Sequence, residues 1–476
     1  MYSEIINDFD YVEYFKNTID SFGGISRGNP KYVFRKNVNN PFPDIGAYFG
    51  CISEGEENTG AYSDLSIVVF PSNEAVKNDD RWIIALGVGS LGFKNDYHLV
   101  SLPGTRRFFM NCLSHDSFIK NDFMDIETQD GFTSFCQRQL IPETLYNAVK
   151  NYSKLLLACT MFDPNNKNEG KKVIKKFLAL YANIRRLPTN QKQRDEVRTI
   201  IQADRKASVD EENEIKTLLA ARKYIVLQGA PGTGKTRMAK RIVEGQGQVF
   251  FTQFHAETSY SDFVYGIVPD VHAAELKYSE REGVFVKSIK AALNCEKNGQ
   301  KVFLIIDEIN RANLSNVLGP AFYLLEPTMS DSDTEIEICP GLSLDKLPEN
   351  LYIIATMNTA DRSLAIVDFA LRRRFAWYTL YPHVITVESG IVFHDKEFND
   401  IVAIFENYAT DEELNLQPGH AYYIVSNKNP DNEIKIRLKY EIMPLIKEYL
   451  NDGMLSRAKD DFVNYFRETI GEEMYR

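Results

Sequence analysis

The spacing of hydrophobic residues changes along the chain, and each change predicts a different kind of structure. In residues 1–150, short apolar runs such as SDLSIVVF and DRWIIALGVGS are bounded by the polar segments GEENTGAY and KNDD, which predicts strands joined by turns. From LIPETLYNAVKNYSKLLLACTMF onward, apolar residues recur every three or four positions, which predicts helices interrupted by the loop DPNNKNEG. Strand and helix patterns then alternate to about residue 382, and a mostly helical pattern continues to the end.

The chain of 476 residues is too long for one hydrophobic core, since single cores stop growing near about 250 to 300 residues. We expect an α+β N-terminal domain in residues 1–150, a helical basic linker region in residues 151–214, an α/β domain in residues 215–385 and a helical domain in residues 386–476. The predicted fold class is therefore α/β, with a parallel sheet followed by helices and preceded by a separate α+β domain.

Composition is that of a globular protein, with 44% hydrophobic and 25% charged residues. No run of about 18 uncharged apolar residues could span a bilayer. The start, MYSEIINDFDYVEYF, lacks the basic and apolar regions of a secretory signal. We therefore expect a soluble, cytoplasmic protein with no membrane partner.

The six cysteines are widely spaced, without a C-x-x-C pair or a nearby histidine at metal-ligand spacing, and we interpret them as reduced core thiols. A formal charge of −11 argues against a uniformly basic nucleic-acid binder. Residues 151–210 nevertheless carry thirteen Lys and Arg against six Asp and Glu. A solvated helical face and a nucleic-acid or partner contact both fit this basic stretch.

The most specific signal is KYIVLQGAPGTGKTRMAKRIV, a β-branched strand followed by G-x-x-x-x-G-K-T and a helical pattern. Glycines in such a loop let backbone N–H groups turn inward around a triphosphate, and the helix presents its positive end to it. Lys235 would reach the β- and γ-phosphates, and the Thr236 hydroxyl would ligate Mg²⁺. The predicted phosphate-binding residues are Gly229, Ala230, Pro231, Gly232, Thr233, Gly234, Lys235 and Thr236.

Two more predicted buried strands end in polar residues, which we expect to lie near the phosphate-binding loop. KVFLIIDE ends in Asp307, which would organise Mg²⁺, and Glu308, which would orient or deprotonate water. LYIIATMN ends in Asn358, whose neutral amide can hydrogen-bond both the attacking water and the γ-phosphate. Because ligands gather at the carboxyl ends of parallel strands, we expect Asn358 to face the same phosphates as Lys235 and Asp307.

Arg372, Arg373 and Arg374 follow the segment SLAIVDFAL, which carries them away from the phosphates of their own chain. A guanidinium that does not reach its own site can serve a neighbouring subunit. Such an arginine finger stabilises transition-state charge and is worth about 10³ to 10⁵ in rate. One or two of the three arginines are instead expected to be surface or salt-bridging residues, Arg372 first among them.

Several blocks resemble the AAA+ NTPases of the MoxR and McrB group: DEINRANLS, MNTADRSLAIVD, ALRRRF, FTQFHAETSYSDFVYGIVP, REGVFVKSIKAAL, QPGHAYY and RLKYEIMPLIKEYL. The resemblance covers about residues 215–455. It implies an AAA+ sheet with a helical C-terminal lid, nucleotide at subunit interfaces of a hexameric ring, and catalysis by Glu308, Asn358, Asp361 and either Arg373 or Arg374. Thr236 and Asp307 would hold Mg²⁺.

The resemblance also implies a function. McrB-like proteins are motor subunits of modification-dependent restriction systems, prefer GTP, and work with a McrC-like endonuclease, so we expect a GTPase that drives a partner nuclease in antiphage defence. ATP remains the alternative, because NTAD (Asn358–Asp361) lies at the sensor strand and does not identify the base. A MoxR-like, ATP-driven remodeller of protein complexes is the rival function, and a nucleotide-gated scaffold is a third.

Self-contained nuclease activity is not expected. The metal-nuclease pattern of P-D then E-x-K occurs at Pro269, Asp270, Glu275 and Lys277 and at Pro430, Asp431, Glu433 and Lys435. The first lies in an insertion, and the second leaves too little chain for a turn between two strands.

In McrB-like proteins the N-terminal domain selects the target, often modified DNA, but residues 1–150 here contain no defined motif. Arg106 and Arg107 lie beside two phenylalanines in a composition suited to DNA contacts. Aromatic rings at Trp82, Tyr97, Phe108 and Phe109 could stack a flipped base or belong to the core. The G-x-G-x-x-G at Gly87, Gly89 and Gly92 opens no helix pattern, so a dinucleotide site is not expected.

Overall fold

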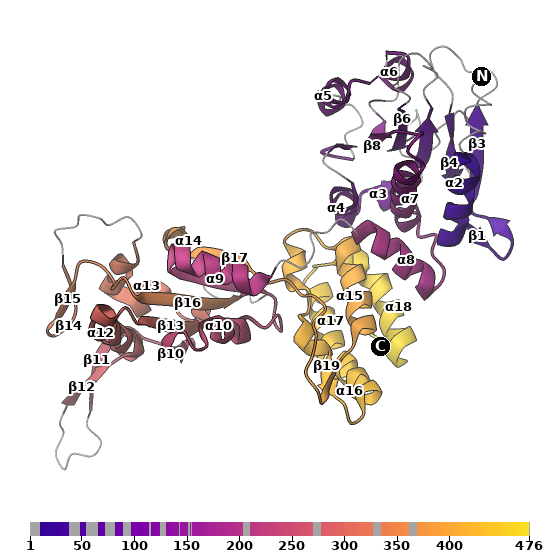
Figure 1. Ribbon diagram of the computed structural model, residues 1–476. Coiled ribbons are helices and arrows are strands. Elements are labelled where there is room, and N and C mark those ends of the chain that lie inside the picture. The colour runs from indigo at the N-terminus through magenta and orange to yellow at the C-terminus, as the bar shows by residue number, and fades with distance from the viewer. Residues whose placement is uncertain are drawn as a thin grey trace. The chain divides into compact units, whose positions relative to one another are not determined.

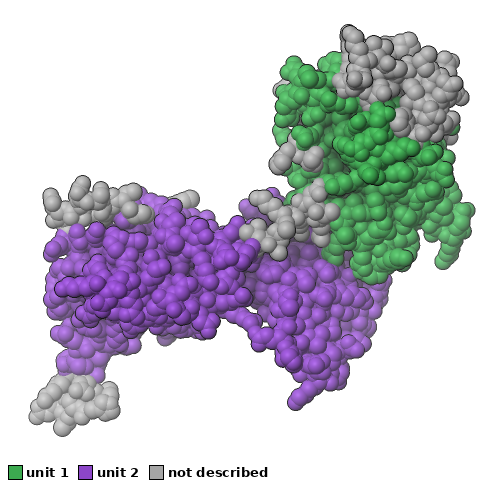
Figure 2. All heavy atoms as spheres, in the orientation of Figure 1, with its two compact units in different colours: residues 1–207 green, residues 208–476 purple. Residues whose placement is uncertain are grey.

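The computed structural model describes residues 10–37, 48–53, 65–71, 81–88, 97–113, 116–123, 130–141, 143–150, 153, 155–202, 210–269, 278–326, 335–360 and 369–475. The chain divides into two compact units, residues 1–207 and 208–476, which are green and purple in Figure 2. Each unit has its own hydrophobic core.

The first unit is built on a six-stranded sheet in which every pair of neighbouring strands is antiparallel (Figure 1). Its strands in spatial order are β3 (Tyr32–Asn37), β4 (Tyr48–Ser53), β5 (Ser66–Phe70), β6 (Trp82–Gly87), β8 (Leu156–Phe162) and β7 (Phe118–Ile119). A separate two-stranded pair is formed by β1 (Ile25–Ser26) and β2 (Asn29–Pro30).

Helices cover both faces of this sheet. Ile67 and Val69 of β5 belong to one core cluster, and Val68 and Phe70 of the same strand belong to another, because successive side chains point to opposite faces. The first cluster packs against α2 (Tyr11–Ile19), α3 (Tyr97–Val100), α4 (Pro103–Cys112), α7 (Lys167–Ile184) and α8 (Gln191–Gln202). The second packs against α5 (Asp130–Gln139) and α6 (Glu143–Lys150).

The helix prediction for the run LLLACTMF is wrong, since residues 156–162 form strand β8, which pairs with β6 from Trp82 opposite Phe162. Both faces of β8 are buried, so its apolar residues form a continuous run without the alternation that would identify a strand. Residues 151–214 accordingly do not form a helical linker. Strand β8 and helices α7 and α8 are part of the first unit, which extends to residue 207.

The second unit begins with α9 (Glu211–Arg222) and contains a five-stranded parallel sheet (Figure 1). The strands in spatial order are β10 (Gly247–Gln253), β13 (Lys301–Asp307), β16 (Leu351–Asn358), β9 (Tyr224–Gly229) and β17 (Ala376–Thr379). The further helices of this unit before the C-terminal part are α10 (Lys235–Val243), α11 (Tyr260–Phe263), α12 (Val284–Cys295), α13 (Leu314–Leu318) and α14 (Phe369–Arg374). Two antiparallel strand pairs lie outside the main sheet: β11 (Tyr265–Pro269) pairs with β12 (Tyr278–Glu282), and β14 (Ile336–Cys339) pairs with β15 (Leu342–Leu344).

Strand register brings three strand ends to one edge of this sheet. Asn358, the last residue of β16, pairs with Gly229, the last residue of β9. Ile306 of β13 pairs with Ala355 of β16, and Asp307 follows at the end of β13. The parallel sheet therefore places the phosphate-binding loop, the acidic pair and the Asn358 amide next to one another.

The C-terminal part is helical, as predicted, with α15 (Asp395–Tyr408), α16 (Pro430–Arg437), α17 (Met443–Asn451) and α18 (Lys459–Ile470). A short antiparallel pair, β18 (Ile391–Phe393) and β19 (Ile424–Ser426), joins these helices. We call residues 386–475 the lid. The predicted fold class is confirmed, with a parallel α/β sheet, C-terminal helices and a separate N-terminal sheet domain.

All six cysteines are free thiols, and five of them are buried. Burial raises the pKa of Cys136 to about 12. Among the described residues, no helix has the length and apolar character needed to cross a membrane.

Candidate nucleotide-binding site

The loop between β9 and α10 has the backbone that a phosphate cradle needs. Gly232 and Gly234 adopt φ values of 81° and 78°, a left-handed conformation that glycine tolerates far better than other residues. Helix α10 begins at Lys235, directly after Gly234. Its first backbone N–H groups therefore lie at the mouth of the loop, where the helix dipole favours an anion.

Lys235 is the cation of this loop and is only 7% exposed. Its Nζ donates hydrogen bonds to the carbonyl oxygens of Gly229 (3.0 Å) and Ala230 (2.8 Å) and to Asn358 Oδ1 (2.6 Å). A buried ammonium needs such partners, because burying an unpaired charge is costly. The structure thus brings Lys235 and Asn358 together, as their positions in the sequence predicted.

Asp307 is the centre of a set of oxygen atoms suited to a divalent cation. The Thr236 hydroxyl donates to Asp307 Oδ1 (2.6 Å), and the Thr356 hydroxyl donates to the same oxygen (2.7 Å). Mg²⁺ prefers oxygen ligands and is commonly held by one or two carboxylates together with substrate phosphates. The hydroxyl of Thr236 and the carboxylate of Asp307 fit that requirement. No cluster of three or more His, Cys, Asp or Glu that could hold a metal occurs within the described ranges.

Thr356 was not predicted from the sequence. Its hydroxyl also accepts a hydrogen bond from the Glu308 backbone N–H (3.1 Å), so it connects β16 to both residues of the acidic pair. Thr356 and Asn358 are two positions apart on one strand and therefore share a face. In the sequence, the position of Thr356 two residues before Asn358 on a predicted strand is the signal that could have identified Thr356.

Glu308 and Asn358 are in direct contact, since Asn358 Nδ2 donates a hydrogen bond to Glu308 Oε1. Burial raises the pKa of Glu308, with the neighbouring Asp307 carboxylate adding to the effect and Arg311 opposing it. Glu308 has a φ of 56°, an uncommon conformation for a residue with a side chain. A second amide, Asn310 Nδ2, donates to the Asn358 carbonyl oxygen (3.3 Å) and ties the two strand ends together.

The three arginines occupy different environments. Arg372 is exposed, with its guanidinium 5.2 Å from the centre of the Trp377 ring. Arg374 is only 6% exposed, pairs with Glu326 Oε2 (2.7 Å) and lies over the Phe322 ring at 4.2 Å.

Arg373 pairs with the same Glu326 oxygen (2.9 Å), but its side chain is 65% exposed. Glu326 was not predicted from the sequence. Of the two predicted finger candidates, Arg374 is packed into its own unit, whereas Arg373 reaches solvent.

Other predicted positions lie elsewhere. Asp361, the nuclease-like residues Asp270, Glu275 and Lys277, and Gly89 and Gly92 fall outside the described residues. The second nuclease-like pattern, Pro430 to Lys435, is on helix α16, where Glu433 Oε2 accepts a hydrogen bond from the Ser426 backbone N–H (2.9 Å).

Two of the aromatic candidates in the first unit are core residues. Trp82 is 1% exposed and packs against the rings of Tyr11, Phe49 and Phe162. Phe109 is fully buried against Phe123. Tyr97 is 54% exposed.

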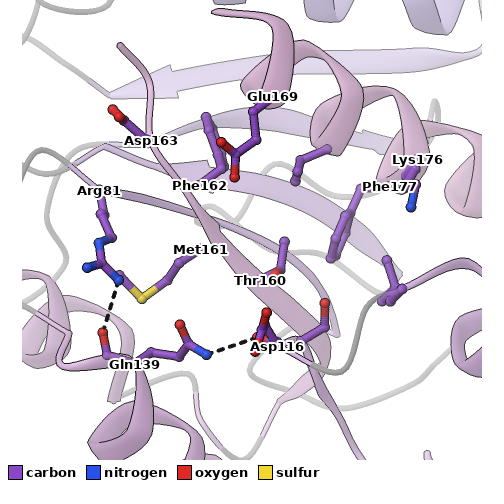
Figure 3. Close-up of a pocket in the computed structure, with 13 residues that line it drawn as sticks. Arg81, Asp116, Gln139, Thr160, Met161, Phe162, Asp163, Glu169, Lys176 and Phe177 are labelled. Carbon is purple, nitrogen blue, oxygen red and sulfur yellow. Dashed lines mark hydrogen bonds between the residues drawn. The ribbon is translucent and has the colours of Figure 1, made fainter. Parts of the chain in front are cut away.

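The first unit also contains a cavity of about 290 Å³ (Figure 3). Leu113, Met161, Phe162, Val173 and Phe177 supply its apolar lining. Its charged lining residues are two cations and three carboxylates: Arg81, Lys176, Asp116, Asp163 and Glu169. Two long hydrogen bonds connect residues along one side of the cavity. Arg81 Nη1 donates to the Gln139 carbonyl oxygen, and Gln139 Nε2 donates to the Asp116 carbonyl oxygen, both at 3.4 Å.

The parallel sheet, the glycine loop and the acidic pair define a P-loop NTPase domain. Residues 224–375 match a family described as AAA domain (dynein-related subfamily). The chain is 32% identical over 279 residues to the type IV methyl-directed restriction enzyme EcoKMcrB subunit of Escherichia coli K12, an alignment that covers 52% of this chain and 59% of that protein. It is 30% identical over 192 residues to the type II restriction enzyme BsuMI component YdiS of Bacillus subtilis 168, covering 32% of this chain and 55% of that protein.

The AAA domain model thus matches residues 224–375, and both curated relatives to which the chain is similar are restriction-system components. The chain spans a little over half the length of both curated relatives. A solved structure from Cytophaga hutchinsonii aligns over 58% of this chain and 69% of its own, with 16% identity and a TM-score of 0.26, and this likeness is too weak to add to the argument.

Proposed function

We propose that this protein is a nucleotide-hydrolysing motor subunit of a restriction complex, with GTP as its preferred nucleotide. The contact network from Lys235 through Asn358 to Glu308, beside the Thr236 and Asp307 pair, carries the proposal. These residues supply a cation for the phosphates, metal-binding oxygens, a carboxylate and a neutral amide, which are four of the groups that hydrolysis at a γ-phosphate uses.

Each residue then has a defined role. The backbone N–H groups of residues 232–236 and the ammonium of Lys235 bind the phosphates. Thr236 and Asp307 would hold Mg²⁺, which neutralises charge on the phosphate oxygens. Glu308 receives the proton of the attacking water, and the Asn358 amide orients that water. Asp361, three positions after Asn358 in the sequence, is proposed to help position the water.

The proposed transition-state cation comes from a second copy of the chain. Arg373 is exposed and paired with Glu326, whereas the Lys235 ammonium is buried in the phosphate-binding loop. An arginine that supplies the finger in trans requires assembly, and we propose the hexameric ring that the McrB-like resemblance implies. Arg374, buried against Phe322 and Glu326, then holds α14 in place.

The partners follow from the restriction relatives. We propose that a McrC-like endonuclease subunit supplies DNA cleavage, that the first unit contacts DNA, whether modified or not, and that the protein is cytoplasmic. The test is turnover of the purified chain with GTP and with ATP, with and without the endonuclease. Faster GTP hydrolysis that the endonuclease stimulates supports the proposal. Turnover with ATP alone that is insensitive to it contradicts the proposal.

One observation favours the rival function, a MoxR-like remodeller of protein complexes. The cavity of the first unit is lined by three carboxylates against two cations, a charge balance that does not attract a polyanion. Gel shifts of the full chain on methylated, glucosylated and plain DNA separate the two. Binding to at least one DNA supports the restriction motor, whereas no binding together with ATP-driven disassembly of a protein complex supports the remodeller.

A further inference from the structure

Glu308, the proposed base, is held at both of its carboxylate oxygens. On one side, Asn358 Nδ2 donates a hydrogen bond to Oε1. On the other side, Arg311 Nε lies 3.5 Å from Oε2 and forms an ion pair with it. Oε2 is buried and accepts no hydrogen bond within the described part of the chain, so the Arg311 guanidinium compensates an oxygen that hydrogen bonds leave unpaired. Arg311 has no part in the hydrolysis described above.

The backbone between Glu308 and Arg311 sets this pairing. Glu308 has a left-handed φ of 56°, and a 3₁₀ turn, Ile309–Arg311, follows it. The Arg311 N–H closes the turn with a hydrogen bond to the Glu308 carbonyl oxygen (2.9 Å). Ile309 and Asn310 are only 1% and 4% exposed, and Ile309 belongs to the core of the unit. Because side chains three positions apart eclipse in such a turn, the anchored backbone returns the Arg311 side chain to Glu308.

The effect of this ion pair is expected on orientation rather than on folding. The Arg311 side chain is 45% exposed and that of Glu308 is 17% exposed. Ion pairs with an exposed member add little to stability. A general base, by contrast, must lie within hydrogen-bonding reach of the proton it takes, and a misplacement of about 1 Å can cost about 100-fold in rate.

The proposed mechanism increases the importance of the Arg311 contact. Lys235 is bonded to Asn358 Oδ1 (2.6 Å), and phosphate oxygens replace Asn358 as its partner when nucleotide binds. The Asn358 amide then turns to the attacking water, and Glu308 Oε1 loses its hydrogen bond from Asn358 Nδ2. Of the two side-chain contacts that hold the carboxylate, the one with Arg311 remains.

We propose that Arg311 is a positioning residue for Glu308, which it aims at the attacking water without contacting the nucleotide. The inference rests on the proposed function and adds to it a cation that acts in the same protomer as the base. In this respect Arg311 differs from Arg373, which pairs with Glu326 and is proposed to serve the neighbouring site.

The experiment compares the full-length wild type with Arg311→Gln, Arg311→Lys and a control. Glutamine removes the positive charge, and lysine keeps it. The control is Arg467→Gln, because Arg467 is 52% exposed and pairs with Glu473 at 2.7 Å, so that a surface ion pair is broken there as well. Turnover with saturating GTP and with saturating ATP, dissociation constants for their non-hydrolysable analogues, and melting temperatures are measured for each protein.

We expect Arg311→Gln to lower turnover by about 10- to 100-fold, with dissociation constants and melting temperature close to those of the wild type. Arg311→Lys should turn over at least about threefold faster than Arg311→Gln, since it keeps the charge but not the geometry of the guanidinium. Arg467→Gln should match the wild type. Unchanged turnover in Arg311→Gln, or a loss that weaker nucleotide binding explains, overturns the inference. Should Arg311→Gln fail to fold, Arg311→Met, which keeps the apolar stem, is measured with the same expectations.

A double-mutant cycle tests whether Arg311 acts through Glu308. Glu308→Gln leaves no carboxylate for Arg311 to hold, so adding Arg311→Gln to it should change the single-turnover rate by less than about twofold. A further loss as large as the one in the wild-type background overturns the inference, because Arg311 then acts independently of the base.

The proposed function fails in a different way. If the wild type hydrolyses neither nucleotide, or if Glu308→Gln hydrolyses as fast as the wild type, Glu308 is not the base. Hydrolysis that depends on Glu308 but is insensitive to Arg311→Gln refutes only the role of Arg311.

Discussion

Lys235 donates a hydrogen bond from Nζ to Asn358 Oδ1 at 2.6 Å, which joins two residues 123 positions apart in the chain. The same Asn358 amide donates from Nδ2 to Glu308. The cation of the phosphate-binding loop, the neutral amide and the carboxylate therefore form one connected chain of hydrogen bonds. In the proposed mechanism, phosphate oxygens replace Asn358 as the partner of Lys235, which leaves the Asn358 amide to orient water.

Lys235→Ala should weaken nucleotide binding by about 10- to 100-fold, because hydrogen bonds to a charged group contribute about 1.5 to 3 kcal/mol and each 1.4 kcal/mol is tenfold. Equilibrium titration with a fluorescent nucleotide measures the change. Lys240→Ala is the matched control on the same helix, since Lys240 is exposed and lies over the Phe251 ring at 4.5 Å. An equal loss in both variants would mean that the effect is nonspecific.

Glu308→Gln should leave binding intact and reduce turnover by at least about a hundredfold, because glutamine still accepts the hydrogen bond from Asn358 but cannot take a proton. Steady-state hydrolysis and nucleotide titration give the two readouts. Glu349→Gln, at an exposed glutamate paired with Lys223, is the control and should change neither. Normal turnover in Glu308→Gln would show that another group activates the water.

Thr356→Val keeps the shape of the side chain but removes the hydroxyl that bonds Asp307 and the Glu308 backbone. We expect a higher Mg²⁺ concentration for half-maximal turnover and a loss of stability of about 1 to 3 kcal/mol, because the Glu308 N–H loses its partner. A Mg²⁺ titration of hydrolysis and a denaturant melt test this. Thr379→Val, which removes a hydroxyl bonded to Gln228 on the edge strand, should leave the Mg²⁺ dependence unchanged.

Gly419→Ala should separate the lid from the phosphate-binding loop. The backbone of Gly419 has a φ of −68°, which alanine adopts without strain, but the new β-carbon would lie 2.1 Å from the Gly232 carbonyl carbon. We expect nucleotide binding at least about tenfold weaker. Gly131→Ala is the control, since its β-carbon would meet the Phe118 ring at 3.3 Å in the first unit. Unchanged affinity would show that the lid contact is dispensable.

The core of the site could be predicted because each part has a local signal. The G-x-x-x-x-G-K-T loop follows a strand and opens a helix, and Asp307, Glu308 and Asn358 each end a buried apolar run. Parallel strands then place these ends at one edge without any knowledge of the side-chain contacts.

Thr356 and Glu326 could not be predicted in this way. Thr356 is brought to Asp307 by the register between two strands, and Glu326 reaches Arg373 and Arg374 across 47 and 48 positions. The sequence predicts a helix where strand β8 forms, because burial on both faces removes the alternation on which a strand prediction depends.

Arg373 and Arg374 both pair with Glu326, and we expect substitution of Arg374 to affect stability and substitution of Arg373 to affect hydrolysis. Arg374→Ala breaks a buried ion pair and should cost about 3 kcal/mol of stability. Arg373→Ala removes an exposed side chain, so the melting temperature should hardly change while turnover falls by about 10³ or more. Melting curves and hydrolysis rates, measured in parallel, distinguish these outcomes.

The central claim is that one protomer holds only part of a hydrolytic centre and takes its cation from the next. Mixing Arg373→Ala with Lys235→Ala tests it most directly, because a mixed interface combines the intact phosphate-binding loop of one variant with the intact Arg373 of the other. We predict that hydrolysis, nearly absent in each variant alone, recovers on mixing and is highest near equal amounts. No recovery at any ratio, in mixtures that assemble, would contradict the account.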